Sequence, residues 1–279
     1  MHAQRVNRKP RPTPVPRALW RLLRGVWHVG VGVFTVWLAF PRWSPARREA
    51  RVQSWSREFL ALWGVELRVI GEPVVLGPTL MVCNHISWLD ILVLHAVRHC
   101  RFVAKSGIRR WPVIGMLAHS AGTLFIERER RSDARRMVHD MSAALQAGDV
   151  LAVFPEGTTG AGEGLLPFHA NLLESALRAN APVQPVYLQF MQKGQGRISH
   201  AADYVGDDTL MASIWRLLRA PAIEAVLHFA PLQTAQGRHR REWAHDLREQ
   251  MGQMQVAWLE QRNPSREHSL LVPALRRDI

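Results

Sequence analysis

Short apolar runs that alternate with helical patterns between residues 65 and 229 constrain the fold more than any other feature of this sequence. The runs predict strands at 65–70, 79–82, 101–104, 123–127, 150–154, 183–190 and 222–229. Helical patterns lie between them at 89–97, about 111–120, 132–147 and 172–179, and a polar helix at 241–260 follows. This alternation predicts an α/β domain with a mixed, largely parallel sheet flanked by helices. In such sheets, ligands bind where strands end.

The N-terminal segment differs from this domain in composition. Residues 1–18 are basic and rich in proline, which is typical of a disordered tail. Leu19 to Phe40 is mostly apolar, but its uncharged part, Gly25 to Phe40, has only 16 residues, and a bilayer-spanning helix needs about 20. Arginines flank the stretch on both sides, which favours a helix that enters one leaflet and returns.

A second amphipathic helix is predicted from Trp43 to Trp63. Its apolar residues recur at helical spacing among Arg and Glu, so it either packs on the first helix, lies at the membrane interface or is an ordinary core helix. Together the two helices predict a membrane-associating helical hairpin in front of the α/β domain.

The charge of the chain indicates an anionic partner. The 36 Lys and Arg exceed the 23 Asp and Glu by 13, and 11 Trp stand against two Tyr. Trp is enriched at membrane interfaces, and nucleic-acid stacking is the alternative use. The two cysteines, Cys83 and Cys100, lack the spacing of a zinc site or a disulfide framework, which fits a reduced compartment.

The stretch from Cys83 to Asp90 has the residues of a general base. His85 follows a buried strand, and Asp90 comes five residues later, in the first turn of a helix. A carboxylate there can bind one imidazole nitrogen while the other nitrogen faces the crevice. Ser87 and Asp90 also match a helix-capping pattern, with Ser87 as the N-cap, so a purely structural interpretation is equally open.

Three further stretches follow predicted strands. Arg128 comes just after the strand at 123–127, where a fixed guanidinium can bind a phosphate with two parallel hydrogen bonds, although a plain surface arginine in a basic run is the alternative. Glu156 lies between a strand and the turn at Gly157 and Thr158, where it could bind a substrate hydroxyl or brace the loop. Pro185 interrupts the strand at 183–190, which suggests an edge strand or a bulge.

The order of these stretches is more specific than any one of them. N-H-x-S-x-x-D, G-x-x-F-I-x-R, F-P-E-G-T and P-V-x-P-V follow one another between residues 65 and 190. This order closely resembles the glycerophospholipid acyltransferase family, in particular its bacterial 1-acyl-sn-glycerol-3-phosphate acyltransferases. The implied organisation is a basic tail (1–18), membrane-associated helices (19–64), an α/β acyltransferase domain (65–262) and a C-terminal tail (263–279).

The resemblance also implies roles for individual residues. His85 would be the catalytic base and Asp90 would orient it, while the substrate-binding residues would be Gly122, Phe125, Arg128, Glu156, Gly157, Thr158 and Lys105. The implied reaction moves an acyl group from an acyl-CoA or acyl carrier protein thioester to a lysophospholipid hydroxyl. A thioester is already activated, so no metal or cofactor is required, and no nucleic acid is involved.

The implied location is the cytoplasmic face of the bacterial inner membrane. Three other functions remain open, and the weakest is a hydrolase that uses His85 and Asp90, because a lipid cleft that excludes water would disfavour it. The ornithine-lipid acyltransferases share the four blocks, so lyso-ornithine lipid is an alternative acceptor. A basic membrane-binding protein without activity is the non-enzymatic alternative.

Overall fold

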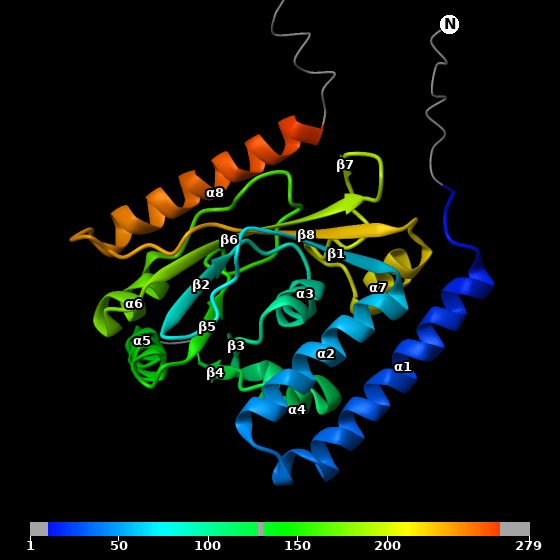
Figure 1. The fold of residues 1–279 in the computed structure, drawn as a ribbon, viewed down its shortest axis with the longest axis horizontal. Coiled ribbons are helices and arrows are strands. Elements are labelled where there is room, and N and C mark those ends of the chain that lie inside the picture. Colours follow the sequence, from blue (N-terminus) through cyan, green and yellow to red (C-terminus); the bar gives the residue numbers. More distant parts are fainter. Residues whose placement is uncertain (1–10, 128–130, 263–279) are drawn as a thin grey trace, which may run out of the picture.

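One eight-stranded sheet forms the centre of the molecule (Figure 1). The computed structural model describes residues 11–127 and 131–262. The sheet has the strand order β1-β8-β6-β2-β5-β3-β4, and β7 pairs with β6. The strands are β1 (Val65–Ile70), β2 (Thr79–Cys83), β3 (Arg101–Lys105), β4 (Leu124–Ile126), β5 (Val150–Val153), β6 (Val183–Gln192), β7 (Arg197–Ile198) and β8 (Ile223–Phe229).

The strand pairing is parallel except around β6. β6 runs antiparallel to both β7 and β8, and the other pairs in the described part of the chain are parallel. The predicted mixed, largely parallel sheet is therefore confirmed. Because β2, β3, β4 and β5 run in one direction, their carboxyl ends meet at one edge of the sheet, which is where His85 follows β2.

Helices cover both faces of the sheet (Figure 1). Side chains of α2, α3 and α7 share one core with alternate residues of the central strands, and those of α5, α6 and α8 share a second core on the opposite face. The helices are α1 (Val15–Leu38), α2 (Pro45–Trp63), α3 (Leu89–Val97), α4 (Pro112–Ser120), α5 (Arg131–Gln146), α6 (Leu173–Ala179), α7 (Leu210–Arg219) and α8 (Arg240–Arg262), with short 3-10 turns η1 (Phe40–Arg42), η2 (Ser106–Arg110) and η3 (Ala170–Leu172).

The first two helices form a hairpin. α1 begins at Val15, inside the basic segment that the sequence assigns to the tail, and it packs on α2 through two glycines. A Cβ atom at Gly25 would lie 2.2 Å from the Trp63 indole nitrogen, and one at Gly32 would lie 2.7 Å from that of Trp55. Within the described residues, no helix combines the length and the apolar character that crossing a bilayer requires. Residues 1–10 of the predicted basic tail (1–18) and the predicted C-terminal tail (263–279) lie outside these residues.

Two further sequence predictions differ from the structure. Pro185 does not mark an edge strand, because β6 lies between β2 and β8. The ring is accommodated because the antiparallel pairing with β8 starts only at Val186, and the Pro185 carbonyl accepts a hydrogen bond from Ala230. The helix α7 has no counterpart among the predicted elements; Thr209 caps it by accepting from the Ala212 N–H.

Candidate active site

The imidazole of His85 is held by Asp90 at the carboxyl end of β2. Nδ1 of His85 lies 2.8 Å from Oδ2 of Asp90, whose side chain is fully buried. The side chain of His85 is 19% exposed, and Nε2 has no hydrogen-bond partner within the residues that the structure describes. The carboxylate thus fixes the proton on Nδ1, and the unpaired Nε2 can accept a proton from a bound hydroxyl.

The start of α3 explains why the carboxylate is held so well. Oδ2 of Asp90 also accepts from the backbone N–H groups of Ile86, at 2.7 Å, and Ser87, at 2.9 Å. The predicted Ser87 N-cap is wrong: the cap position is Trp88, and the Ser87 hydroxyl accepts only a 3.3 Å contact from the Leu89 N–H within the described chain. The two interpretations of this stretch therefore combine in one carboxylate, which both braces the turn and binds the imidazole.

Asn84 fixes the backbone immediately before the histidine. Its side-chain amide donates to the Leu188 carbonyl at 2.9 Å and accepts from the Leu188 N–H at 2.7 Å. This pair of bonds continues the pairing of β2 with β6 beyond the end of the strand. Cys83, one residue earlier, is buried, and burial raises the pKa of its thiol well above the ordinary value. The thiol is therefore neutral, which leaves the imidazole as the base at this strand end.

A phenyl ring that sequence analysis did not single out supports the imidazole. The ring of Phe154 stacks on His85 with centroids 3.9 Å apart and an interplanar angle of 10°. Phe102 stacks behind Phe154 at 5.7 Å and is itself buried. Phe154 follows β5, and β5 is the parallel neighbour of β2. Sequence analysis could have identified Phe154 only by predicting that these two strands pair. Phe154 holds the plane of the imidazole, and Asp90 holds its rotation within that plane.

Glu156 braces the loops around the histidine. Its side chain is 5% exposed; Oε1 accepts from the His85 N–H at 3.1 Å and Oε2 from the Leu166 N–H at 3.2 Å. Burial raises the pKa of Glu156 to about 7, although the two N–H groups act in the opposite direction. Both oxygens are engaged by the backbone, so the geometry favours the bracing role over direct contact with a substrate hydroxyl.

The loop between Glu156 and α6 is fixed from both sides. On the histidine side, the Gly160 N–H donates to the His85 carbonyl at 2.8 Å. On the other side, Gln255 of α8 donates to the Gly162 carbonyl at 3.0 Å, and Arg248 donates to the carbonyl of Leu165 at 2.8 Å. The C-terminal helix is thereby connected through this loop to the backbone of the catalytic candidate.

The remaining predicted residues lie at different places around the sheet. Lys105 ends β3 at the same edge as His85 and is exposed, as is Thr158 in the turn after β5. Gly157 has φ +71°, a left-handed conformation that suits glycine, and the ring of His169 lies over its Cα.

The block around β4 is only partly described. Gly122 precedes β4 and so lies toward the opposite edge from His85, where its carbonyl accepts from Arg101 at 2.8 Å. Phe125 lies within β4 and is half-buried. Arg128 falls outside the described residues. The structure therefore brings His85, Asp90, Glu156 and Gly157 together and leaves Gly122 apart from them.

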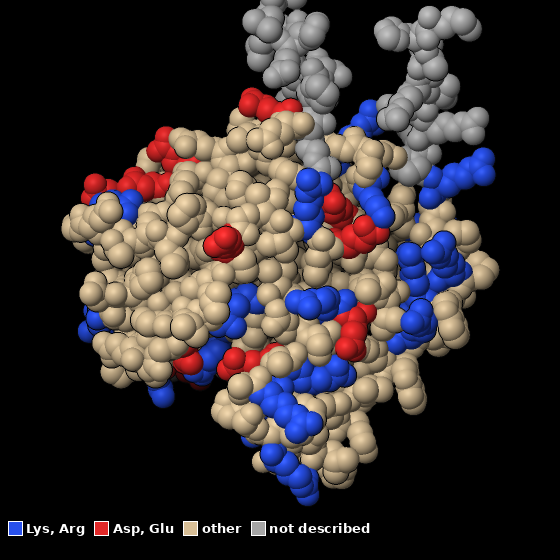
Figure 2. Space-filling model, viewed as in Figure 1, with Lys and Arg blue, Asp and Glu red and all other residues tan. Residues whose placement is uncertain are grey.

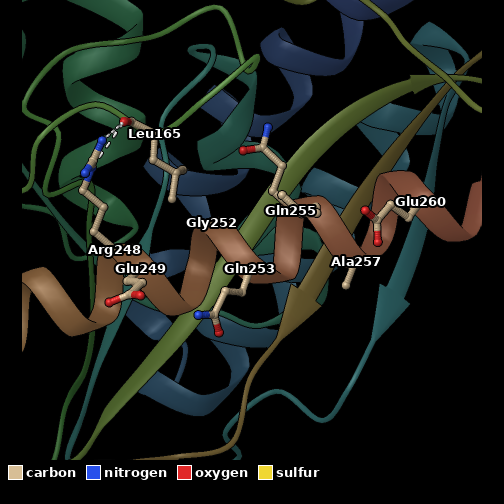
Figure 3. Close-up of a pocket in the computed structure, with 9 residues that line it drawn as sticks. Leu165, Arg248, Glu249, Gly252, Gln253, Gln255, Ala257 and Glu260 are labelled. Carbon is tan, nitrogen blue, oxygen red and sulfur yellow. Dashed lines mark hydrogen bonds between the residues drawn. The ribbon is translucent and has the colours of Figure 1, made fainter. Parts of the chain in front are cut away.

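A shallow groove of about 510 Å³ lies elsewhere, along α8 (Figure 3). Arg248 reaches from one end of it to the Leu165 carbonyl, and Glu260 lies at the other end. None of the predicted site residues lines this groove. The site at the end of β2 is therefore the one whose chemistry matches the sequence prediction.

Comparisons with known proteins agree with this assignment. A sequence model described as Acyltransferase matches residues 66–189. The lyso-ornithine lipid O-acyltransferase of Pseudomonas aeruginosa is 34% identical over 232 residues, which cover 81% of this chain and 88% of that protein. The 1-acyl-sn-glycerol-3-phosphate acyltransferase of Neisseria meningitidis is 36% identical over 176 residues, which cover 62% of this chain and 68% of that protein.

A solved structure has the same fold. The crystal structure of the 1-acyl-sn-glycerophosphate acyltransferase of Thermotoga maritima matches 87% of this chain and 95% of its own, with a TM-score of 0.65 and 18% identity. The family matches and the shared fold lead to one conclusion: this chain is an enzyme of the acyltransferase family that includes the bacterial lysolipid acyltransferases.

Proposed function

We propose that this acyltransferase moves a fatty acyl group from a thioester to the free hydroxyl of 1-acylglycerol-3-phosphate and so forms phosphatidic acid. The observation that supports the proposal most is the pairing of His85 with Asp90 at 2.8 Å, which leaves Nε2 open. The donor is an acyl-CoA or an acyl carrier protein, and both present the same thioester.

In the proposed reaction, His85 acts as a general base. Nε2 takes the proton of the acceptor hydroxyl as its oxygen attacks the thioester carbonyl, and a carbon–oxygen bond forms. Asp90 stabilises the imidazolium that results. The carbon–sulfur bond then breaks, and the imidazolium returns the proton to the departing thiolate. The sequence has no G-x-S-x-G nucleophile turn, so direct transfer without an acyl-enzyme is the simpler mechanism.

Lys105 and Arg128 would bind the acceptor phosphate. Lys105 lies at the end of β3, and Arg128 follows β4 by two residues in the sequence. Glu156 would act by keeping the turn at Gly157 in place beside His85, in accordance with its two backbone hydrogen bonds.

The enzyme would reach its lipid acceptor by lying on a membrane. α1 exposes several large apolar side chains, among them Trp20, Trp27 and Trp37, at 60%, 76% and 72%. Such a helix can insert its apolar face into one leaflet without crossing the bilayer. The proposed location is the cytoplasmic face of the bacterial inner membrane, where both thioester donors occur.

A second acceptor is favoured by a specific observation. The lyso-ornithine lipid O-acyltransferase of Pseudomonas aeruginosa matches this chain over more of both chains than the Neisseria meningitidis protein does. The alternative acceptor is therefore a lyso-ornithine lipid, which has no phosphate. On that acceptor, the loss of Arg128 should matter little.

An acceptor panel tests the proposal. Purified protein is incubated with labelled acyl-CoA or acyl carrier protein and with either lysophosphatidic acid or lyso-ornithine lipid, and the product is identified. We expect phosphatidic acid, with His85→Ala reducing turnover at least about a thousandfold and the exposed control His245→Ala leaving it unchanged. Turnover by His85→Ala at the parent rate would exclude the proposed base.

A further inference from the structure

Exposed apolar side chains gather on three neighbouring segments. Of the 21 large hydrophobic side chains that are exposed in the described residues, nine lie on α1, three at the start of α4 and two on α7. The remaining seven are scattered over the molecule. The members outside α1 are Trp111, Val113 and Ile114 at α4, and Met211 and Trp215 on α7. A concentration of this kind marks a surface that meets a protein or a membrane.

The helix α1 connects the other two segments. α1 contacts both α4 and α7 in the fold. Where the chain enters α1, the Thr13 N–H donates to the Arg219 carbonyl at 2.8 Å, and its hydroxyl donates to the Ala220 carbonyl at 2.6 Å. The end of α7 is therefore fixed beside the start of α1, and we call α1, residues 106–120 and α7 together the apolar platform.

The helix α7 has one face inward and another outward. Ser213 and Leu217 are buried, and the Trp88 indole N–H donates to the Ser213 hydroxyl at 3.1 Å. Met211 and Trp215 are 65% and 39% exposed. Trp88 follows His85 by three residues. The contact between Trp88 and Ser213 therefore connects α7, and with it the platform, to the candidate active site.

The charge of the platform selects its partner. Residues 15–38, 106–120 and 210–219 contain no Asp or Glu. They contain seven arginines: Arg17, Arg21, Arg24, Arg109, Arg110, Arg216 and Arg219. Arg216 pairs with Asp208. Figure 2 shows Lys and Arg side chains along α1, whereas Asp and Glu lie along α8 at the upper left. Apolar side chains among arginines without carboxylates suit an anionic lipid bilayer.

We propose that the start of α4 and the exposed face of α7 enter the surface of an anionic bilayer together with α1. The inference rests on the proposed function in one respect, namely that α1 lies on a membrane. It extends that contact to a helix that packs on Trp88, so the leaflet that supplies the acceptor lies beside the candidate active site. Tryptophan at 111 and 215 suits the headgroup level of such a surface.

Vesicle sedimentation with the full-length protein tests the inference. The vesicles contain phosphatidylcholine with or without phosphatidylglycerol, and no acyl donor is present, so the result is independent of catalysis. We expect Trp111→Ser/Ile114→Ser and Met211→Ser/Trp215→Ser each to weaken partitioning onto anionic vesicles about tenfold, since each removes burial of two apolar side chains. The matched control is Val75→Ser/Leu76→Ser, which removes side chains that are 75% and 77% exposed outside the platform and should bind like the parent.

A second measurement on the parent protein guards against misfolded variants. In oxidative footprinting, vesicles should protect Met211 and Trp111 and leave Leu76 reactive. Parent-like partitioning by both platform variants, or unprotected Met211 on bound protein, would overturn the inference. Dissociation of a dimer by the same substitutions without lipid would assign the platform to a second copy, and lost affinity for an acidic carrier protein with unchanged vesicle binding would assign it to that donor.

Discussion

Oδ2 of Asp90 accepts hydrogen bonds from Nδ1 of His85 and from two backbone N–H groups of the intervening turn. The other oxygen, Oδ1, is buried and has no partner within the described residues. Oδ2 alone therefore fixes both the backbone of the turn and the orientation of the imidazole. Because no donor binds Oδ1, the charge of the side chain can be removed without breaking a hydrogen bond at that oxygen.

Asp90→Asn should separate charge from geometry. The amide oxygen can replace Oδ2 toward the three donors, and the amide nitrogen can occupy the position of Oδ1. We expect kcat to fall about a hundredfold to ten-thousandfold because the imidazolium loses its counter-charge, while the thermal midpoint changes by only a few degrees. Steady-state kinetics and calorimetry measure the two effects. The exposed control Asp140→Asn should leave both unchanged; a kcat within twofold of the parent would contradict the role of Asp90.

Phe154→Leu should loosen the imidazole. The stacking partner at 3.9 Å is lost, so we expect kcat to fall about fivefold at an unchanged acceptor KM, because aromatic stacking is worth about 1 kcal/mol. The control is Phe190→Leu, which removes a ring of the buried core and should cost stability without a comparable loss of kcat. Equal losses of kcat in the two variants would show that Phe154 acts only through packing.

Glu156→Gln should change how stability depends on pH. The pKa of Glu156 is raised from 4.5 to about 7 in the folded chain, so the folded state holds this proton more tightly than the unfolded state. The corresponding stability is present below pH 4.5 and is lost as pH rises through about 7. Glutamine cannot ionise, so the free energy of unfolding of the variant relative to the parent should rise by about 2–3 kcal/mol between pH 4.5 and pH 8. Urea titrations at several pH values test this, and parallel curves would contradict it.

His95→Phe should have its effect at acidic pH. His95 is 4% exposed, and burial, with a smaller contribution from His99, lowers its pKa from 6.5 to about 3. The stability that comes from keeping His95 neutral is complete above pH 6.5 and is lost as pH falls toward 3. The loss at pH 5 amounts to about 2 kcal/mol. We expect the variant to resist acid unfolding better than the parent. The same substitution at the exposed His139 controls for the loss of a histidine as such, and identical acid sensitivity of His95→Phe and the parent would refute the prediction.

Gly25→Ala and Gly30→Ala form a matched pair on α1. A Cβ atom at Gly25 would lie 2.2 Å from Trp63, whereas a Cβ atom at Gly30 has no atom within 4 Å. Alanine favours a helix over glycine by about 1 kcal/mol, so Gly30→Ala should raise the thermal midpoint. Gly25→Ala should lower it because α1 must move away from α2. Equal midpoints would show that α1 does not pack on α2 in solution.

The sequence predicts the sheet and the His85–Asp90 pair because both depend on local patterns. Strand β2 is a continuous apolar run between turn residues, and the spacing of five residues to Asp90 lies within one strand end and one helical turn. The misassignment of Ser87 has a local cause as well, since two side chains matched the capping pattern and the carboxylate was the stronger acceptor.

The rest of the site depends on pairings that are distant in the sequence. Phe154 reaches His85 only because β5 lies beside β2, and Glu156 receives its second hydrogen bond from Leu166 in a loop without periodicity. Pro185 suggests an edge strand or a bulge because the sequence does not reveal that the antiparallel pairing of β8 with β6 starts only at Val186. Helix α7 was missed because it lies in a stretch whose polar flanks resemble a loop.

The pairing of β1 with β8 has a consequence for biosynthesis. Val65 can pair with Ile223 only after the strands between them have been synthesised, whereas α1 and α2 are synthesised before any strand of the sheet. The amphipathic hairpin is therefore available to a bilayer well before the outer margin of the sheet can close. If the hairpin binds a bilayer as proposed, membrane contact should precede completion of the sheet, which waits for β8 to pair with β1.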